Sequence, residues 1–591
     1  MRRLSLVILT LALTAPAAAA PPPAAPTVRD FGAVGDGEAD DTAAFQRAVD
    51  AGVGDVRLPR GRYRLTRPVV VDLDRVGPTA LHGTGAATVV MDGAGPAIRF
   101  VGTHDGTAAP SSVKPNVWAR QRSPMAVGFE IVGAHPESGG IEATGTMQLT
   151  LDRLTIRKVQ HAVRLAERNR NVIVTACHLY ENRGVGLYLD DVNLHQINVT
   201  GSHISYNGGG GIVVRAGNVR NLHVTGCDVE GNMAADGPPT ANVLIDSTGG
   251  AAGCGEVAIV GCTIQHTRSA KGSANVRVIG TDGGGARRGN VLIADNVLSD
   301  VHVNVHVAKA RGVAIVGNTF WQGHEYDLLV EDTRSLVVGP NLLERAPSYQ
   351  YAAHAANGIL FRRCHDATIV GLHVLGVTGG PAGVVLQECR RCNVTGCTVL
   401  DCDGAGLLLK DVTDSRVSGC LIRHAQPPEG WRPVVVQGCE NVFIDAAAPP
   451  PKAAPYAVNL LQRRMRWIPM DARGGTARGA LGPRPRSWRC LRPPCVPLRR
   501  PARPRRRSPF CGPGPLPATS PPGSTNRSSA DGKRRRPNAS TTNCTPGAWS
   551  STTARPALRS SSATISASGA SCSTRRSSGS TPRRICRWTG C

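Results

Sequence analysis

The chain has 591 residues, of which 41% are hydrophobic and only 4% aromatic, and its formal net charge at pH 7 is +25. A chain of this length can bury a large core, and this composition predicts a core of Val, Ile, Leu and Ala in narrow, stacked layers. The charge does not indicate a nucleic-acid partner for the folded part. From Gly474 onward there are 23 Lys and Arg against one acid, Asp531, so the preceding residues are nearly neutral.

The N-terminal segment has the pattern of an export signal. Residues 1–20, MRRLSLVILTLALTAPAAAA, begin with two arginines, continue with an apolar stretch and end in small residues. This pattern predicts a cleaved signal peptide and therefore a secreted or periplasmic protein. No later apolar run approaches the roughly 20 residues that a membrane-spanning helix needs, so we expect no integral membrane association.

The next segment, DFGAVGDGEADDTAAFQRAVD at 30–50, combines glycines and acids ahead of a helical pattern. The glycines permit backbone turns that are closed to other residues. Asp40 and Asp41 are predicted to cap a helix over about 42–51. The apolar side chains of this helix fall on one side and suit plugging the open end of a stacked core: Phe45, Ala48 and Val49. A catalytic role for Asp36, Asp40 or Asp41 is the less favoured alternative.

A repeated phrase runs through the middle of the chain. It reads VIVTACHL at 172–179, INVTGSHI at 197–204, LHVTGCDV at 222–229 and VAIVGCTI at 257–264. One position anchors the copies: Cys177, Ser202, Cys227, Cys262, Asn296, Asn318, Asn341, Leu372, Cys397 and Cys420. Most spacings are 22–25 residues, and we interpret three of 31–35 as loops inserted into single coils. Short strands repeated in this way bury a core only by stacking in register, so the repeats predict a parallel β-solenoid.

The solenoid explains the cysteines and asparagines of the repeats. Side chains in the anchor column would stack about 4.8 Å apart inside the coils. A second inward column holds Cys364, Cys389 and Cys439. We interpret these thiols as small buried side chains. Two alternatives stay open, namely disulfides between coils and a zinc site at Cys389, Cys392, Cys397 and Cys402. Recurring asparagines at equivalent turns predict a structural ladder: Asn182, Asn207 and Asn232.

These features of the sequence resemble those of one protein family. The segment VRDFGAVGDGEADDTAAFQRAVDAG with VRLPRGRYRL, within residues 28–65, closely resembles the N-terminal signature of β-helix proteins of the pectate lyase superfamily. This superfamily includes polygalacturonase-like enzymes, mannuronan epimerases and phage tailspikes. The repeats extend the resemblance to about residue 445. It implies an all-β fold, a right-handed parallel β-helix with a short N-terminal capping helix, over a domain of residues 21–470.

The resemblance implies no reaction. Of the polygalacturonase motifs, only an Asp-Asp pair, Asp190 with Asp191, has a counterpart, whereas Asn-Thr-Asp, Gly-His-Gly and Arg-Ile-Lys are absent. The Asp-Pro-His-Glu motif of mannuronan epimerases is also absent. Candidate site residues therefore come from the geometry of the columns.

Side chains that point outward from stacked strands form columns on the surface. In the strand GLYLDD, Tyr188 and Asp190 are predicted to point outward. On neighbouring coils Arg164 falls in the Tyr188 column, and Arg215 and Asp246 fall in the Asp190 column. These five residues, the outward patch, are our candidate catalytic residues. Farther along, the two columns carry Arg277, His306, Glu331, Arg362 and Lys410.

Two chemical interpretations of the outward patch are open. Paired carboxylates could act as acid and base in glycoside hydrolysis. Alternatively, Arg164 and Arg215 could neutralise a uronate carboxylate while Tyr188 or a histidine moves the proton in β-elimination or epimerisation. The plainer alternative is a solvent face on which charges of opposite sign relieve each other.

A different face shows His178, His203 and Asp228 on three successive coils. Because histidine titrates near neutral pH, this triplet is a candidate substrate-binding group. A solvated surface is the plainer alternative.

These observations predict an exported polysaccharide-active protein, a lyase or a glycoside hydrolase of acidic, uronate-containing glycans. The alternative is a non-catalytic carbohydrate-binding or surface-structural β-helix. We predict a polysaccharide partner and no cofactor or metal, with calcium left open because acidic loops can bind it. Residues 471–591, rich in Arg, Pro and Ser, are expected to be a disordered basic tail or the product of a shifted reading frame.

Overall fold

The computed structural model describes residues 25–445, apart from 251, 268–269, 282–288 and 350–353. The predicted signal peptide, 1–20, and the predicted tail, 471–591, lie outside the described residues. Within the described part no helix has the length and apolar composition needed to cross a bilayer.

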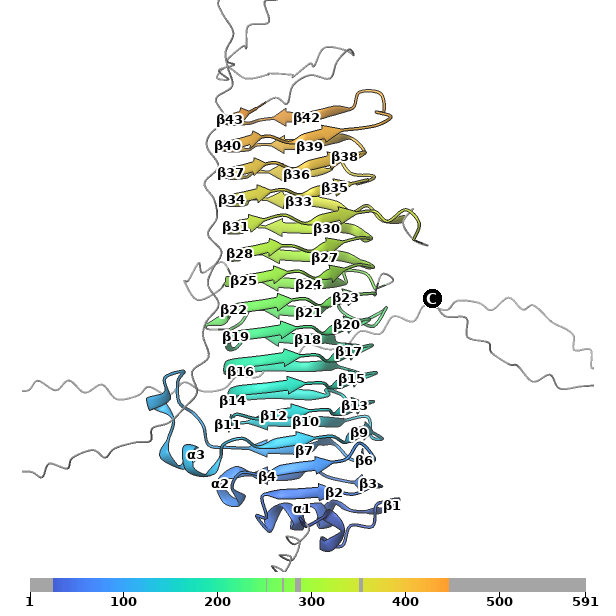
Figure 1. Cartoon of the computed structure of the whole chain (residues 1–591), viewed down its shortest axis with the longest axis vertical. Coiled ribbons are helices and arrows are strands. Elements are labelled where there is room, and N and C mark those ends of the chain that lie inside the picture. The colour runs from blue at the N-terminus through green and yellow to red at the C-terminus, as the bar shows by residue number, and fades with distance from the viewer. Residues whose placement is uncertain (1–24, 251, 268–269, 282–288, 350–353, 446–591) are drawn as a thin grey trace, which may run out of the picture. The chain divides into compact units, whose positions relative to one another are not determined.

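The N-terminal capping helix is confirmed. Helix α1 (Thr42–Asp50) follows η1 (Val28–Phe31) and lies at the base of the stacked coils (Figure 1). The side chains predicted to plug the core, Phe45, Ala48 and Val49, are all buried. The ring of Phe45 meets that of Tyr63 edge-on at 5.2 Å between centroids.

The prediction for the two capping acids is right for one and wrong for the other. Asp40 Oδ1 accepts a hydrogen bond from the Thr42 backbone N–H at 3.0 Å. Asp41 occupies the N-cap position, but its buried carboxylate does not cap the helix. It accepts from the backbone N–H groups of Val34 and Gly35 and so holds the preceding loop. A carboxylate that ties the loop to the helix start has a structural role, and the same holds for Asp36, which accepts from its own turn.

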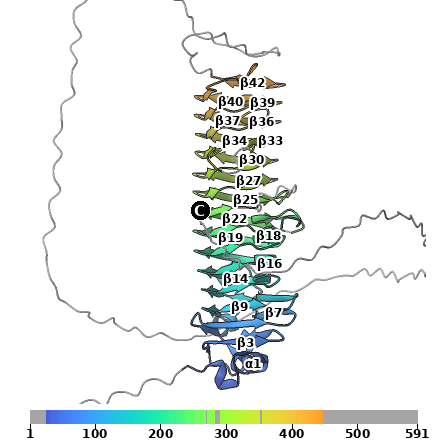
Figure 2. The same cartoon turned by 90° about the vertical axis from the view of Figure 1, so that its right-hand side faces the viewer.

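The described strands pair in parallel throughout and form two sheets, and both views show the strands of successive coils stacked one above another (Figures 1 and 2). The 15-stranded sheet consists of β1 (Asp36–Asp40), β3 (Gly61–Leu65), β6 (Ala87–Met91), β9 (Glu130–Gly133), β13 (Thr155–Arg157), β15 (His178–Tyr180), β17 (His203–Ser205), β20 (Asp228–Glu230), β23 (Thr263–Gln265), β26 (Val297–Leu298), β29 (Thr319–Phe320), β32 (Leu342–Glu344), β35 (His373–Leu375), β38 (Thr398–Leu400) and β41 (Leu421–Arg423).

The 28-stranded sheet contains the longer strands of each coil. Its first half consists of β2 (Asp55–Leu58), β4 (Val69–Asp72), β5 (Ala80–Gly83), β7 (Gly95–Val101), β8 (Met125–Val127), β10 (Ser138–Thr144), β11 (Thr146–Met147), β12 (Thr150–Asp152), β14 (Val163–Thr175), β16 (Val185–Thr200), β18 (Gly210–Arg215), β19 (Asn218–Thr225), β21 (Ala241–Asp246) and β22 (Gly253–Val260). Its second half consists of β24 (Ala274–Ile279), β25 (Gly289–Ala294), β27 (Val301–Ala308), β28 (Arg311–Val316), β30 (Gly323–Glu331), β31 (Arg334–Val338), β33 (Gly358–Arg362), β34 (His365–Val370), β36 (Val384–Gln387), β37 (Arg390–Thr395), β39 (Ala405–Lys410), β40 (Thr413–Ser418), β42 (Arg432–Gln437) and β43 (Glu440–Ile444).

The two longest strands, β14 and β16, each run through a corner, and in the next coil the corner at Ala216 separates β18 from β19, so this sheet wraps around two faces of the coil. In β14 the corner lies at Glu167, which has φ +56°, and the pairing register shifts there. The next strand, β16, turns at Asp191, with φ +44°. Asp191 Oδ1 accepts from the Gly217 backbone N–H of the following coil at 3.0 Å. Asp191 is therefore a corner residue, whereas its neighbour Asp190 precedes the corner.

The predicted asparagine ladder is confirmed and extends beyond the three residues found in the repeats. Asn182 Nδ2 donates to Asn207 Oδ1 at 2.8 Å, and Asn207 Nδ2 donates to Asn232 Oδ1 at 2.7 Å. The ladder continues through buried side chains of five more residues: Asn242, Asn275, Asn304, Asp327 and Asn357. Its amides satisfy one another away from water, which removes the cost of burying them.

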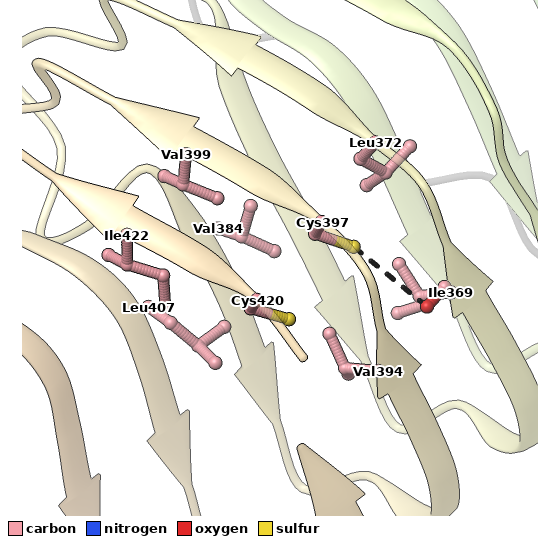
Figure 3. Close-up of a pocket in the computed structure, with 9 residues that line it drawn as sticks. All are labelled: Ile369, Leu372, Val384, Val394, Cys397, Val399, Leu407, Cys420 and Ile422. Carbon is pink, nitrogen blue, oxygen red and sulfur yellow. Dashed lines mark hydrogen bonds between the residues drawn. The ribbon is translucent and has the colours of Figure 1, made fainter. Parts of the chain in front are cut away.

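The anchor column is also confirmed as an interior column. Its members are buried, except for Cys420, which is half-buried. Cys397 Sγ lies 3.9 Å from the carbonyl oxygen of Ile369, and the two sulfur atoms of Cys397 and Cys420 face the same interior gap (Figure 3). Apolar side chains line the rest of this gap, so it is a packing defect of the core. All eleven described cysteines are free thiols.

Helices α2 (Leu73–Val76) and α3 (Pro115–Arg120) lie outside the coils, and η2 (Pro110–Ser112) precedes α3. The loop between β7 and β8, residues 102–124, carries both η2 and α3. Val113 and Val117 of this loop pack on Met147 of β11, which fixes the loop against the face of the sheet beyond the corner.

Candidate functional site

The register of the strands confirms the two outward columns. Arg164 is paired with Tyr188, and Asp190 is paired with Arg215, which in turn is paired with Asp246. The outward patch therefore lies on strands β14, β16, β18 and β21, in front of the corner. The later members of the columns also fall in the predicted positions: Arg277, His306, Glu331, Arg362 and Lys410.

Arg164 is enclosed by carboxylates. Its Nε and Nη2 donate to Asp190 Oδ2 at 2.9 and 2.7 Å, and its Nη1 donates to Glu142 Oε2 at 2.8 Å. The other oxygen of Glu142 accepts from Arg99 Nε at 2.9 Å. This ladder of alternating charge neutralises Arg164 within the protein, so Arg164 positions Asp190 and holds no free charge for a ligand.

Tyr188 and Asp190 form the polar centre of the patch. Burial and a hydrogen bond to Asp190 raise the pKa of Tyr188 to about 12. Burial alone would raise the pKa of Asp190, but hydrogen bonds from Arg164 and Tyr188 outweigh it and hold that pKa below its ordinary value. At neutral pH the pair is therefore a protonated phenol bonded to a carboxylate.

His161, which the sequence columns did not reveal, completes the centre. Its ring lies 5.0 Å from the ring of Tyr188, centroid to centroid. His161 Nδ1 accepts from the Val185 backbone N–H at 3.1 Å, so in the neutral ring Nε2 carries the proton. Burial, and then the charge of Arg164, lower the pKa of His161 and keep it neutral. The ring has room because Gly184 has no side chain, and a Cβ there would lie 2.8 Å from it.

Arg215 and Asp246 differ in how they are held. Arg215 is exposed and makes no ion pair with any residue that the structure describes. Asp246 Oδ1 accepts from the backbone N–H and the hydroxyl of Thr248 at 3.0 and 2.6 Å, which commits it to a turn. Neighbouring charges along this column thus do not neutralise each other, and Arg215 is available to an anionic ligand.

Family matches cover most of the described coils. Residues 26–101 match the family described as rhamnogalacturonase A/epimerase, pectate lyase-like, and residues 130–264 and 305–446 match the right handed beta helix region. The chain is a right-handed β-helix protein of the pectate lyase-like superfamily. The predicted fold and the predicted family are therefore both confirmed.

This β-helix protein also matches curated relatives over a short segment. Mannuronan C5-epimerases AlgE3 and AlgE5 of Azotobacter vinelandii are 58% identical to it over 43 residues, which is 7% of this chain and 2% and 4% of theirs. The matched segment is thus a small part of those relatives. Among solved structures, the A-module of mannuronan C-5 epimerase AlgE4 from Azotobacter vinelandii aligns with 73% of this chain and 100% of its own, with 14% identity and a TM-score of 0.34. The Streptococcus pneumoniae adhesin PfbA aligns with 71% of this chain and 92% of its own, with 14% identity and a TM-score of 0.33.

The predicted histidine group lies on the other sheet of the β-helix protein. His178, His203 and Asp228 follow one another on β15, β17 and β20 of the 15-stranded sheet. The two histidine rings stack at 5.1 Å, and His203 Nδ1 lies 3.8 Å from Asp228 Oδ2. The His203 side chain is 60% exposed. The group is therefore separate from the outward patch.

Next to this histidine group lies a second set that the sequence did not single out. Glu230 Oε2 lies 3.1 Å from His266 Nδ1, and Glu230 also accepts from Gln265 and Tyr206. Several contacts lower the pKa of Glu230 to about 2, and the hydrogen bond from His266 has the largest effect. Glu230 is thus fully engaged as an ionised acceptor.

The later outward columns also hold a closed network. Arg277 Nε donates to His306 Nδ1 at 3.3 Å, and His306 Nε2 lies 3.3 Å from Glu331 Oε2. Arg277 also donates to the carbonyl oxygens of Thr240 and Gly272, which pins the two inserted loops. These residues hold the loops in place.

Among the described residues no three His, Cys, Asp or Glu side chains gather in a way that could hold a metal ion. The four cysteines considered for zinc are buried in the core.

Proposed function

We propose that this β-helix protein is exported and acts on acidic, uronate-containing polysaccharides at the outward patch, by proton transfer next to the uronate carboxylate. The observation that carries the proposal is the Tyr188–Asp190 pair beside Arg215, an exposed cation without an ion-pair partner among the described residues. The names of the relatives, mannuronan epimerases, agree with a polyuronate substrate.

Hydrolysis is the less suitable chemistry for this patch. A glycosidase needs one carboxyl group that is protonated at the working pH as the general acid. Asp190 has a lowered pKa, Glu142 is shared by two arginines, and Asp246 is held in a turn. All three carboxylates already act as hydrogen-bond acceptors within the protein, so we favour a lyase or an epimerase.

In the proposed reaction Arg215 binds the carboxylate of the sugar, which draws charge from C5 and makes its proton easier to remove. Because the pKa of Tyr188 is about 12, a phenolate is not available at neutral pH. The Tyr188 oxygen therefore takes the C5 proton in the same step in which the phenol proton passes to Asp190. The electrons of the C5–H bond form the C4=C5 double bond, and the C4–O4 bond breaks.

The proton held by Asp190 then returns through Tyr188 to O4 of the leaving sugar, which restores the resting state. An epimerase would instead return a proton to the opposite face of C5 and leave the chain intact. Neutral His161 donates from Nε2 and can stabilise the negative charge that develops on the carboxylate. No cofactor enters these steps.

A second candidate, a non-catalytic glycan-binding β-helix, is favoured by one observation. Arg99, Glu142, Arg164 and Asp190 satisfy one another in a closed ladder, as they would on a purely structural face. In that case Arg215 would bind glycan without a reaction.

The test uses the purified full chain against polymannuronate, polyguluronate, polygalacturonate and a neutral glucan, with and without calcium. We expect unsaturated chain ends, followed by ultraviolet absorbance, or a changed uronate ratio, followed by NMR, only with the acidic polymers. Tyr188→Phe and Asp190→Asn should lower kcat at least 100-fold, because the proton relay is lost. Arg215→Gln should mainly raise KM.

Arg153→Gln is the matched control, since Arg153 is 66% exposed and pairs with Asp152 away from the patch. Retention of acidic glycans without any reaction, lost in Arg215→Gln, would select the binding function. New reducing ends without unsaturation would show hydrolysis and contradict the proposed chemistry.

A further inference from the structure

Beyond the corner of β14, two arginines are buried side by side. Arg168 is 9% exposed and Arg170 is 7% exposed. Being two residues apart on one strand, they point to the same face. Their register partners on β16 are Asn193 and His195, so the four side chains form a block on the outer face of the sheet. The loop of residues 102–124 covers the two arginines, with His104, 2% exposed, against Arg168. Asn193 stays exposed and His195 is half-buried at the edge of the block.

These two buried arginines lack the carboxylate partners that several other arginines of the coils have. Arg164, Arg157 and Arg362 each pair with an Asp or Glu. By contrast, neither Arg168 nor Arg170 has an ion pair with any acid in the described part of the chain. Their neutral partners are the side-chain oxygen of Asn193 for Arg168, and the carbonyl oxygens of Thr107 and Ala108 for Arg170. Two buried positive charges without a counter-charge are costly, and burial lowers the pKa of both groups.

Several buried polar atoms of this block have no hydrogen-bond partner. Arg168 Nε and Arg170 Nε are closed off from solvent and have no hydrogen-bond partner. His104 Nε2 lies 3.4 Å from Arg168 Nη2 and accepts from it, so His104 Nδ1 carries a proton, and this atom also lacks a partner. His195 Nδ1 is a fourth buried atom without a partner.

The chemistry of these atoms distinguishes an anion from a water molecule. Three of the four are donors, and an anion offers only acceptor capacity, so it can satisfy each donor that reaches it. A water molecule can accept two, but its own protons would then need acceptors that the block does not offer. Burial, followed by the charges of Arg168 and Arg170, lowers the pKa of His104 to about 4, so at neutral pH the histidine adds a donor without adding charge.

We propose that the block of Arg168, Arg170, His104 and His195 binds a small inorganic anion of halide size beneath the 102–124 loop. The anion supplies the missing counter-charge and ties the loop to the sheet. Because Arg168, Arg170 and His104 are buried beneath the loop, a polysaccharide carboxylate does not reach them, and the site is independent of the proposed activity.

Two acids are competing sources of negative charge: Glu256, which acts electrostatically on His195, and Asp105. The exposed carboxylate of Asp105 pairs with Lys114 Nζ at 2.7 Å, and Asp105 is the one acid that acts electrostatically on Arg168. If Asp105 turned inward in solution, no anion would be needed. The experiment must therefore separate a bound anion from an acid of the protein.

The test follows thermal unfolding of the full chain at fixed ionic strength while chloride replaces gluconate, which is too large to enter. We expect the unfolding midpoint of the wild type to rise with chloride and to saturate. Arg168→Gln should lose this response, whereas the control Arg153→Gln should keep it. The chloride NMR line should broaden more with the wild type than with Arg168→Gln.

A wild type that does not respond to chloride would overturn the proposal, and a lowered midpoint for Asp105→Asn would then assign the counter-charge to Asp105. An equal response in wild type and Arg168→Gln would also overturn it. Should Arg168→Gln fail to fold, the saturation and the NMR broadening of the wild type alone decide the matter.

Discussion

The asparagine ladder includes one carboxyl group, that of Asp327, and this makes a sharp prediction about stability. Asp327 is fully buried, and its Oδ1 accepts from Asn304 Nδ2 at 2.7 Å and from the Gly323 backbone N–H at 3.2 Å. Its Oδ2 accepts from Asn357 Nδ2 at 3.1 Å. All three donors are neutral. Burial therefore dominates and raises the pKa of Asp327 from 3.8 to about 6.

The sign of the pH dependence follows from this shift. In the folded protein Asp327 binds a proton as the pH falls through about 6, whereas in the unfolded chain it does so only near 3.8. The folded state is thus favoured at low pH, and this contribution is lost as the pH rises through about 6. A shift of about two pKa units corresponds to about 3 kcal/mol.

Asp327→Asn removes the charge and keeps the ladder. The new amide can donate to Asn357 Oδ1, which is buried without a partner, once the Asn357 amide turns over. We expect the variant to exceed the wild type in unfolding free energy by up to about 3 kcal/mol at pH 7.5, with the difference shrinking to near zero at pH 4.

Urea unfolding of both proteins at pH values from 4 to 8 measures this difference, and subtracting the two curves cancels all other titrating groups. Asp236→Asn, on an exposed part of an inserted loop, is the matched control and should parallel the wild type. Parallel pH profiles of Asp327→Asn and wild type, or a less stable variant at pH 7.5, would refute the reasoning.

Two further changes test the fold and the candidate site. Asn207→Ala should lower the unfolding free energy by about 3 kcal/mol, because it removes the buried acceptor of the Asn182 backbone N–H and amide and the amide that donates to Leu179 O and Asn232 Oδ1. Denaturant unfolding measures this, and a loss below about 1 kcal/mol would show that the ladder relaxes. Gly184→Ala should cost about 2 kcal/mol and reduce activity, because the new Cβ would lie 2.4 Å from the Gln160 carbonyl oxygen and would displace His161. Gly380→Ala, where the nearest atom is 3.7 Å away, is its control and should be near neutral in both assays.

Much of the outward patch could be predicted from the repeats, because the register of a solenoid follows directly from the phrase that repeats. Arg164, Tyr188, Asp190, Arg215 and Asp246 lie in the predicted columns for this reason. The repeats could not predict which of these charged side chains already form ion pairs within the protein.

Two residues of the site were missed for different reasons. Glu142 lies one coil before the first clear repeat phrase, yet it is paired with Arg164, so extending the columns backward would have found it. His161 lies in a turn outside the strand pattern. It reaches Tyr188 only because Gly184 of the next coil leaves space, and spacing within one strand cannot show such an approach.

The sequence by itself determined the fold and the interior columns of asparagine and cysteine, because these depend on the spacing of the repeats. It also determined the capping helix and the family, because these depend on a contiguous N-terminal segment. The tertiary structure alone decided how charges pair across coils and where each strand turns its corner. Arg164 and Arg168 are four residues apart on β14, yet the corner at Glu167 places them on different faces. One is neutralised by carboxylates and the other is buried without one, because the residues that surround each come from different coils and loops.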